Sequence, residues 1–247
     1  MRLLVDIGNS RIKWALGGAG ELSAPAGFAR PRAGQADAWE REWGHLSPLG
    51  VTICSVAGRQ SVAGLRDWVE RRWAIPFTEV RAREYCGSII NAYRDPSSLG
   101  ADRWANLLGA RAALGPVDSI IVDAGTAVTV DALRADGRHL GGAILAGLSA
   151  SRAGLRAAAP ALPEANDEAP LPSDNTAGAI GGGTLIGLAG AIERVATVVG
   201  GRLTAPERIL TGGDAERFAP WLDAGWTLDP RLTLRGLLHA GDTACAG

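Results

Sequence analysis

The sequence predicts an α/β protein built from two similar lobes. An apolar strand, an Asp, a tight glycine turn and a returning strand follow one another at residues 3–13, and this pattern returns at residues 120–129. The chain of 247 residues is long enough for two domains of moderate size. Its hydrophobic content of 47% is sufficient for packed cores. The repeat and the length together favour duplication of one lobe.

The first lobe alternates strands and helices. Its predicted strands are short apolar runs bounded by turn residues, at residues 3–5, 12–16, 51–56 and 77–80. Helices are expected where apolar side chains recur at the spacing of one helical face, near residues 36–43 and at 61–73. A loop precedes a third helix, which begins at Asp102 and ends before Gly115 and Pro116. This point separates the two predicted lobes, residues 1–115 and 116–247.

The second lobe repeats this order. Strands are expected at residues 120–122, 127–133, 140–145 and 207–210, and helices at 149–159, 176–199 and 232–239. Three consecutive glycines at residues 181–183 predict a kink or a close approach by another segment. Another glycine turn, at residues 211–214, opens a further helix.

Composition excludes several classes of partner and site. The net charge of −1 predicts no nucleic-acid partner. No apolar run approaches the roughly 18 residues of a membrane span, and Asp6 interrupts the apolar N-terminus where a signal peptide would continue. We therefore expect a cytoplasmic protein without a membrane partner. Walker A, dinucleotide-binding and nucleophile-elbow motifs are absent from the sequence.

The two glycine turns carry the side chains of a phosphate-binding site. The first supplies Asp6, Asn9, Ser10 and Lys13, and the second supplies Asp123, Gly125 and Thr126. Phosphoryl transfer needs amide and hydroxyl donors, a cation, and carboxylates that hold metal, and all of these are present. Lys13 is the only lysine among 25 basic residues. Either turn alone is ordinary turn chemistry, whereas two copies favour a nucleotide-phosphate site.

Asp102 and Arg103 allow two interpretations. In the first, Asp102 stabilises the start of a helix through the helix dipole and Arg103 is solvated. In the second, Asp102 is a base for a substrate hydroxyl and Arg103 binds a substrate carboxylate. The residues themselves leave both open.

The motifs taken together resemble those of type III pantothenate kinases. The matching motifs are Asp6-x-Gly8-Asn9-Ser10-x-x-Lys13, Gly100-Ala101-Asp102-Arg103, Asp123-x-Gly125-Thr126 and Thr211-Gly212-Gly213-Asp214. They occur in the order found in that family and cover essentially the whole chain. The resemblance implies the acetate and sugar kinase/Hsp70/actin fold, with two duplicated ribonuclease H-like lobes of mixed sheets flanked by helices and an ATP cleft between them. It also implies a homodimer.

The implied activity is ATP-dependent phosphorylation of pantothenate to 4'-phosphopantothenate, the first step of coenzyme A biosynthesis. The resemblance assigns ATP binding to Asp6, Ile7, Gly8, Asn9, Ser10, Arg11, Ile12, Lys13 and Thr126. It assigns pantothenate binding to Tyr93, Gly100, Ala101, Asp102, Arg103 and Thr176, the last across the dimer interface. Asp102 is the implied catalytic base. Mg2+ accompanies ATP, and Asp123 binds a monovalent cation, K+ or NH4+.

Two positions depart from the family pattern, and two rival functions stay open. Ser10 stands where the family usually has Thr, which keeps the hydroxyl, and Ala146 stands where it usually has Pro. The nearest rival function is that of another small-molecule kinase of the same superfamily. The other is a non-catalytic nucleotide-binding transcriptional accessory protein.

Overall fold

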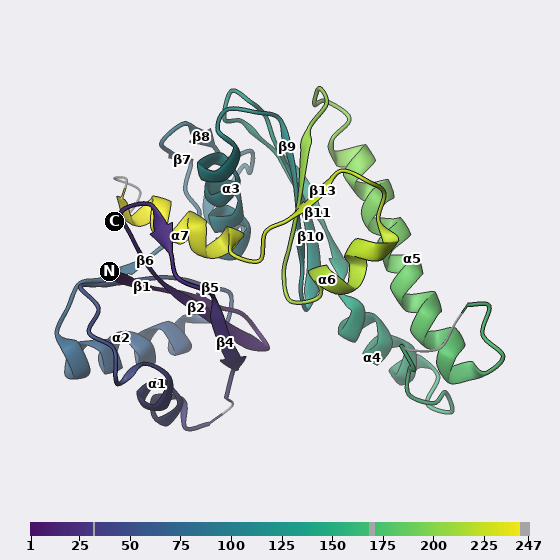
Figure 1. Cartoon of the computed structure of the whole chain (residues 1–247), viewed down its shortest axis with the longest axis horizontal. Coiled ribbons are helices and arrows are strands. Elements are labelled where there is room, and N and C mark those ends of the chain that lie inside the picture. The colour runs from purple at the N-terminus through teal and green to yellow at the C-terminus, as the bar shows by residue number, and fades with distance from the viewer. Residues whose placement is uncertain (32, 168–170, 243–247) are drawn as a thin grey trace. The chain divides into compact units, whose positions relative to one another are not determined.

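The computed structural model describes residues 1–31, 33–167 and 171–242 as two compact units (Figure 1). Unit 1 comprises Met1–Pro116, the turn Asp136–Arg138 and the C-terminal stretch from Arg231. Unit 2 comprises Val117–Ala135 and His139–Pro230. The ATP cleft expected between the two lobes stays a prediction.

Unit 1 is built on a sheet whose central strand ends at the first glycine turn. The sheet contains β1 (Arg2–Ile7), β2 (Arg11–Gly18), β3 (Glu21–Leu22), β4 (Ala26–Ala29), β5 (Val51–Ser55) and β6 (Phe77–Glu79). Its order is β3-β2-β1-β5-β6, with β4 also paired to β2. Strand β2 runs antiparallel to β1, whereas β5 is parallel to β1 and β6 is parallel to β5. The antiparallel half is joined by short turns, and the parallel half needs a helical crossover.

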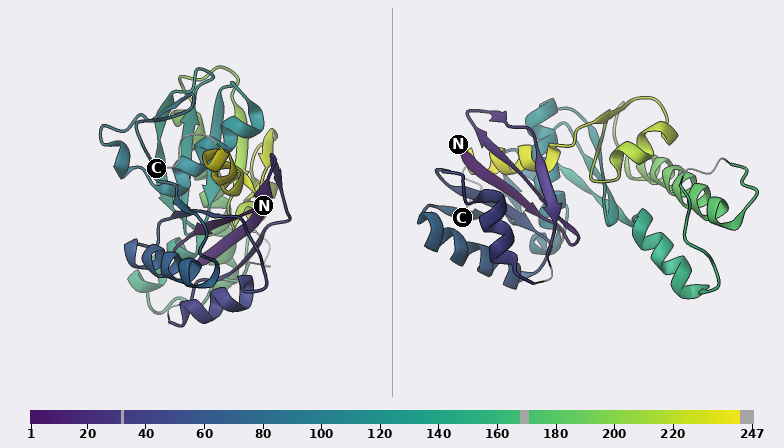
Figure 2. Two further views of the ribbon diagram at one scale, coloured as in Figure 1. Left: turned by 90° about the vertical axis from the view of Figure 1, so that its left-hand side faces the viewer. Right: turned by 60° about the horizontal axis from the view of Figure 1, so that its bottom comes forward.

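Helices cover both faces of this sheet. On one face, α1 (Gln35–Trp43) and α2 (Arg59–Trp73) lie side by side (Figure 2) and bury alternate β1 residues, including Leu3 and Val5. On the other face, α7 (Leu232–Asp242) packs against β1, and α3 (Ala101–Leu114) packs against α7. Alternate residues of a strand point to opposite faces, so Leu4 and Asp6 lie on the face of α7.

The contact between α3 and α7 depends on two glycines. A Cβ atom at Gly236 would lie 1.8 Å from the carbonyl oxygen of Ala105, and one at Gly109 would lie 2.2 Å from that of Leu232. The same contact buries a hydrogen bond of 2.8 Å, donated by the Thr233 hydroxyl to Asn106 Oδ1. The C-terminal helix therefore packs within unit 1, although it falls within the second predicted lobe, residues 116–247.

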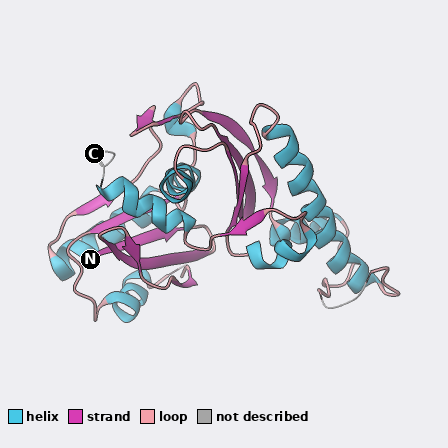
Figure 3. Cartoon of the chain, turned by 45° about the horizontal axis from the view of Figure 1, so that its top comes forward, coloured by secondary structure: helices cyan, strands magenta, loops and turns pink. Residues whose placement is uncertain are grey.

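Unit 2 repeats the sheet of unit 1. Its strands are β9 (Ser119–Ala124), β10 (Ala127–Leu133), β11 (His139–Ala146), β12 (Glu207–Thr211) and β13 (Trp226–Leu228), in the order β11-β10-β9-β12-β13. As in unit 1, the second strand is antiparallel to the first, and the two after the helices are parallel. Helices α4 (Leu148–Ala158), α5 (Thr176–Val199) and α6 (Ala215–Phe218) accompany the sheet. The matching strand order confirms the predicted fold class of two mixed sheets flanked by helices (Figure 3).

Helix α5 is the main helix of the unit 2 core. It has 24 residues, and the mean hydropathy over an 18-residue window is 1.3, so by length and composition it could cross a membrane. No such segment was expected from the sequence. One face, formed by Leu185, Ala189, Ile192 and Ala196, is buried in the same cluster as alternate residues of β9 and β10. Core helices of globular proteins pass the same test of length and composition.

The longer elements expected from the sequence are all present in the described chain, and the shortest strands were missed. The unpredicted strands are β3, β4, β13 and the hairpin of β7 (Tyr85–Cys86) and β8 (Ile89–Ile90). Each has two to four residues, which is too few for a periodic pattern to stand out. The close approach predicted at residues 181–183 is confirmed, because a Cβ atom at Gly181 would lie 1.9 Å from the Asn166 oxygen.

The glycine contact between α3 and α7 predicts a large cost for one added methyl group. We expect Gly236→Ala to lower the free energy of unfolding by about 1–3 kcal/mol, because the helices must separate or the backbone must shift. Gly190→Ala, in α5, is the matched control because a Cβ atom there meets nothing within 4 Å. It should be neutral or stabilise by about 0.5–1 kcal/mol through helix propensity. Urea denaturation of both variants measures the difference, and equal values would contradict the packing described.

Candidate functional site

The β1–β2 turn is closed by its own backbone. Gly8 N–H donates to the carbonyl oxygen of Arg11 over 3.0 Å, so this amide holds the turn together rather than facing a ligand. Asn9, Ser10 and Arg11 are exposed, and their polar groups are the ones that solvent or an anion can reach. Ile7 and Ile12 are buried partners across the ladder. Their side chains belong to the core, so they can contact a ligand only through backbone atoms.

Asp6 lies between two side chains brought beside it by strand register. Lys13 of β2 is its antiparallel partner and Cys54 of β5 its parallel partner. Residues paired in this way point to the same face of a sheet. The Cys54 thiol, which is fully buried, donates to Asp6 Oδ1 over 3.5 Å. The turn therefore places a carboxylate and the only lysine side by side.

Arg30, which no sequence pattern singled out, also contacts this turn. Its Nε donates to the carbonyl oxygen of Asn9 over 2.9 Å, and its backbone N–H donates to that of Ser10 over 2.9 Å. A longer contact of 3.4 Å joins Arg30 Nη1 to the hydroxyl of Ser61 at the start of α2. Arg30 follows strand β4, which was not predicted, so no sequence pattern placed it next to residues 9 and 10.

A second group of predicted residues meets at the start of α3. Gly100 precedes the helix, and Ala101 and Asp102 form its first turn. Asp102 Oδ1 accepts a hydrogen bond of 2.7 Å from the backbone N–H of Arg103. A Cβ atom at Gly100 would lie 2.6 Å from that same oxygen, so a glycine gives the carboxylate its room.

Arg103 is buried, with 4% of its surface exposed. Its Nη1 donates to the Tyr93 hydroxyl over 2.7 Å, and its guanidinium carbon lies 5.5 Å from the centre of the Tyr93 ring. The interpretation of Arg103 as a solvated residue is therefore wrong. A guanidinium in such a place is suited to pair with a carboxylate or a phosphate.

In unit 2, the β9–β10 turn is built as its counterpart in unit 1. Gly125 N–H donates to the carbonyl oxygen of Ala127 over 3.0 Å, and Thr126 is exposed at the tip. Gly147 lies against this turn and donates its N–H to the Thr126 oxygen over 3.0 Å. A Cβ atom at Gly147 would lie 2.0 Å from the Gly125 oxygen, so this contact requires glycine.

Asp123 has the same place in its sheet as Asp6, with different neighbours. Its antiparallel partner is Thr129 of β10, and its parallel partner is Thr211 of β12. The carboxylate therefore lies beside two hydroxyl-bearing side chains, where Asp6 has a lysine and a cysteine. Oxygen ligands of this kind suit hard cations.

The turn that follows Thr211 is tied to a network of arginines. Gly212 has a φ of +107°, and Asp214 N–H donates to the Ala124 oxygen over 2.9 Å. Asp214 also accepts a hydrogen bond from Arg217 over 3.3 Å.

Asp167 accepts hydrogen bonds from both Arg217 and Arg152. Arg152 Nε also donates to the Thr184 hydroxyl over 2.9 Å. The pKa of the Asp167 carboxyl lies below its ordinary value, chiefly because of the Arg152 hydrogen bond and against a smaller effect of burial.

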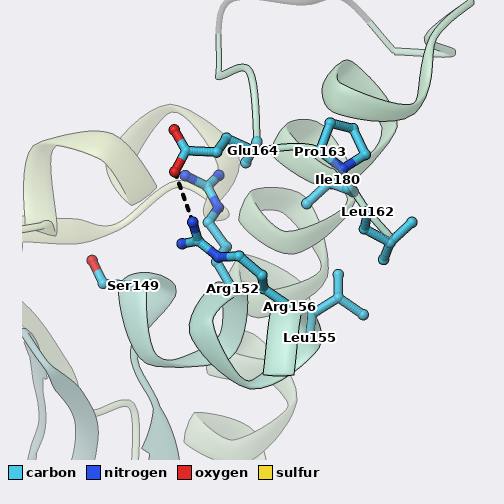
Figure 4. A pocket seen from close by; sticks show the side chains of 9 residues that line it. Ser149, Arg152, Leu155, Arg156, Leu162, Pro163, Glu164 and Ile180 are labelled. Atoms are coloured by element: carbon cyan, nitrogen blue, oxygen red, sulfur yellow. Dashed lines mark hydrogen bonds and ion pairs between the residues drawn. The ribbon is translucent and has the colours of Figure 1, made fainter. Parts of the chain in front are cut away.

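Thr176 is exposed on the first turn of α5. The helix start is capped by Asn175, whose Oδ1 accepts from Gly178 N–H over 2.9 Å. A cavity of about 240 Å3 lies along α4 and α5, and Figure 4 shows Arg152, Arg156 and Glu164 at its wall. Arg156 Nη1 and Glu164 Oε1 form an ion pair of 2.7 Å (dashed in Figure 4). The described lining residues include none of the predicted site residues.

No dedicated metal cluster is found in the described part of the chain, where no three His, Cys, Asp or Glu side chains are grouped to hold an ion. This is compatible with Mg2+ delivered on a nucleotide. Such an ion is bound by one or two protein carboxylates together with the phosphates. Asp6 in unit 1 and Asp123 in unit 2 are the carboxylates at the ends of the two central strands.

Comparisons with known proteins agree on one family. A sequence model of the family described as type III pantothenate kinase matches residues 2–198. The chain is 37% identical to the type III pantothenate kinase of Halorhodospira halophila, covering 97% of each protein. It is 36% identical to that of Nitrosococcus oceani, covering 99% of this chain and 95% of the relative.

Solved structures share the fold at low sequence identity. A putative Baf family transcriptional activator from Campylobacter jejuni gives a TM-score of 0.63 at 22% identity, covering 97% of this chain and 98% of the other. A putative 2-dehydro-3-deoxygalactonokinase from Sinorhizobium meliloti gives 0.57 at 17% identity, covering 98% and 99%. These likenesses confirm the predicted α/β fold of two similar mixed sheets flanked by helices.

The lowered pKa of Asp167 predicts how stability depends on pH. A carboxylate with a depressed pKa in the folded state stabilises fully above its unfolded pKa of about 3.9. That stabilisation is lost as the pH falls through the lower, folded pKa. We expect Asp167→Asn to be less stable than wild type at pH 7, with the difference shrinking below about pH 4.

Urea denaturation of wild type and Asp167→Asn across this range measures the effect. The matched control is Asp223→Asn, an exposed aspartate of unit 2, which should change stability by less than about 0.5 kcal/mol at any pH. A constant difference between wild type and Asp167→Asn at all pH values would exclude the ionic role.

Proposed function

Because the chain belongs to the type III pantothenate kinase family, we propose that it transfers the γ-phosphoryl group of ATP to pantothenate. The product is 4'-phosphopantothenate, and the reaction is the first step of coenzyme A biosynthesis. The acceptor is the primary hydroxyl of pantothenate. The observation that carries the proposal is the arrangement at the start of α3, where Asp102 adjoins a buried Arg103 held by Tyr93.

The β1–β2 turn is the proposed ATP phosphate site. The residues assigned to ATP are Asp6, Ile7, Gly8, Asn9, Ser10, Arg11, Ile12, Lys13 and, from unit 2, Thr126. The exposed Asn9 and Ser10 supply polar donors, and Lys13 places a positive charge next to Asp6. Asp6 is the carboxylate that would hold Mg2+, which would neutralise the negative charge of the ATP phosphates.

The start of α3 is the proposed pantothenate site. Asp102 accepts the proton of the attacking hydroxyl, which raises the nucleophilicity of that oxygen as it approaches the γ-phosphorus. Arg103 binds the pantothenate carboxylate, and its burial strengthens this attraction because little water competes. Tyr93, Gly100 and Ala101 complete the site within unit 1, and Thr176 is assigned to it from a second subunit of a homodimer.

Asp123 is the proposed ligand of the monovalent cation, K+ or NH4+. The register that places Thr129 and Thr211 beside it supports this assignment. In unit 1 the equivalent neighbour is Lys13, whose ammonium group already supplies a positive charge. We place the protein in the cytoplasm, without nucleic-acid or membrane partners.

We expect purified protein to form ADP from ATP only when pantothenate is added. We also expect the rate of ADP formation to fall sharply when K+ is replaced by Na+. A coupled kinase assay with Mg2+ measures both effects. A panel of sugars and of acceptors lacking a carboxylate tests the rival kinase activities, since Arg103 favours acceptors with a carboxylate. Absence of pantothenate-dependent ADP formation would refute the proposal, and it is the result that a non-catalytic regulator would give.

Asp102 is the residue proposed to act as the base. We expect Asp102→Asn to reduce kcat by at least ~100-fold, because the amide cannot accept the hydroxyl proton. Binding of ATP and pantothenate, measured by calorimetry, should change little because the shape of the side chain is kept. Retention of most of the activity would assign the base to another residue, and loss of pantothenate binding would make Asp102 a binding group only.

A further inference from the structure

The loop before α3 is organised around the side chain of Asn91, which is 8% exposed. Its Nδ2 donates to the carbonyl oxygens of Arg83, over 3.1 Å, and Pro96, over 3.2 Å. Its Oδ1 accepts from the backbone N–H of Tyr93 over 3.0 Å. One amide group thus joins the segment entering the β7–β8 hairpin, the middle of the loop and the 3-10 turn Pro96–Ser98.

These contacts continue to the proposed acceptor site. Tyr93, whose backbone is fixed by Asn91, receives the hydrogen bond of 2.7 Å from Arg103 Nη1. Its ring also lies along the same guanidinium. Hydrogen bonds therefore connect Asn91, through Tyr93, to the buried Arg103. Neither the resemblance nor the family comparisons assign a role to Asn91.

We propose that Asn91 is a positioning residue for the acceptor substrate, which acts through Tyr93 to orient Arg103. This inference rests on the proposed function, because pantothenate is the acceptor whose carboxylate Arg103 binds. The chemistry requires an amide: two N–H groups donate to two carbonyl oxygens while one oxygen accepts an N–H. An aspartate of the same shape lacks both donors and places a negative charge against two carbonyl oxygens.

Steady-state kinetics of Asn91→Asp and Asn91→Ala test the proposal. A displacement of about 1 Å of a substrate-positioning group can lower the reaction rate by up to two orders of magnitude. We expect the KM for pantothenate to rise at least ~10-fold, with the KM for ATP unchanged and kcat reduced less than the KM is raised. If Asn91→Ala fails to fold, Asn91→Asp carries the test, since it keeps the shape of the side chain.

A structural role alone predicts lower stability without this kinetic pattern. Thr233→Val is the matched control, because it removes one buried hydrogen bond of 2.8 Å from the same unit. It should lower the melting temperature and leave the KM for pantothenate unchanged. An equal effect of the control on that KM, or a normal KM in both Asn91 variants, would overturn the proposal.

A double-mutant cycle separates action through Tyr93 from a general loosening of the loop. In a Tyr93→Ala background, Asn91→Asp should change the KM for pantothenate by less than about 2-fold, because the group it positions is gone. Additive effects would overturn the proposal. Wild-type turnover with pantothenate is measured in the same series, so failure of the proposed function is seen separately from failure of the role of Asn91.

Discussion

Strand register at the end of each central strand is the constraint on which the proposed phosphate and cation sites depend. In both units an aspartate lies near the end of the central strand, directly before a glycine turn, with one antiparallel and one parallel neighbour. A register shift of one residue would turn each aspartate to the opposite face. The buried apolar residues that alternate with Asp6 and Asp123 therefore fix where the carboxylates point.

The two copies keep the backbone and differ in the side chains next to the aspartate. Lys13 and Cys54 accompany Asp6, whereas Thr129 and Thr211 accompany Asp123. One site thus carries its own positive charge, and the other offers oxygen atoms to a positive charge from solution. The divergence supports separate roles for the two halves of the duplication, with phosphate binding proposed for one and cation binding for the other.

The sequence predicted the features that local patterns encode. Both glycine turns, the long helices and the principal strands follow from spacing along the chain, because turn chemistry and periodicity are short-range properties. The contacts of Arg30 with Asn9, of Cys54 with Asp6 and of Arg217 with Asp167 join residues 21, 48 and 50 positions apart. No local pattern encodes them. The burial of Arg103 likewise depends on tertiary packing, which rules out a solvated Arg103 and leaves its role as a carboxylate binder a prediction.

The place of α7 in unit 1 has a consequence for synthesis of the chain. Helix α7 covers Leu4 and packs against Gly109 of α3, and it consists of the last described residues, Leu232–Asp242. It therefore leaves the ribosome after unit 2 has been translated. Until then, the N-terminal unit exposes apolar surface on one side of its sheet. The packing of unit 1 on this face is therefore completed only after the chain has been synthesised as far as α7.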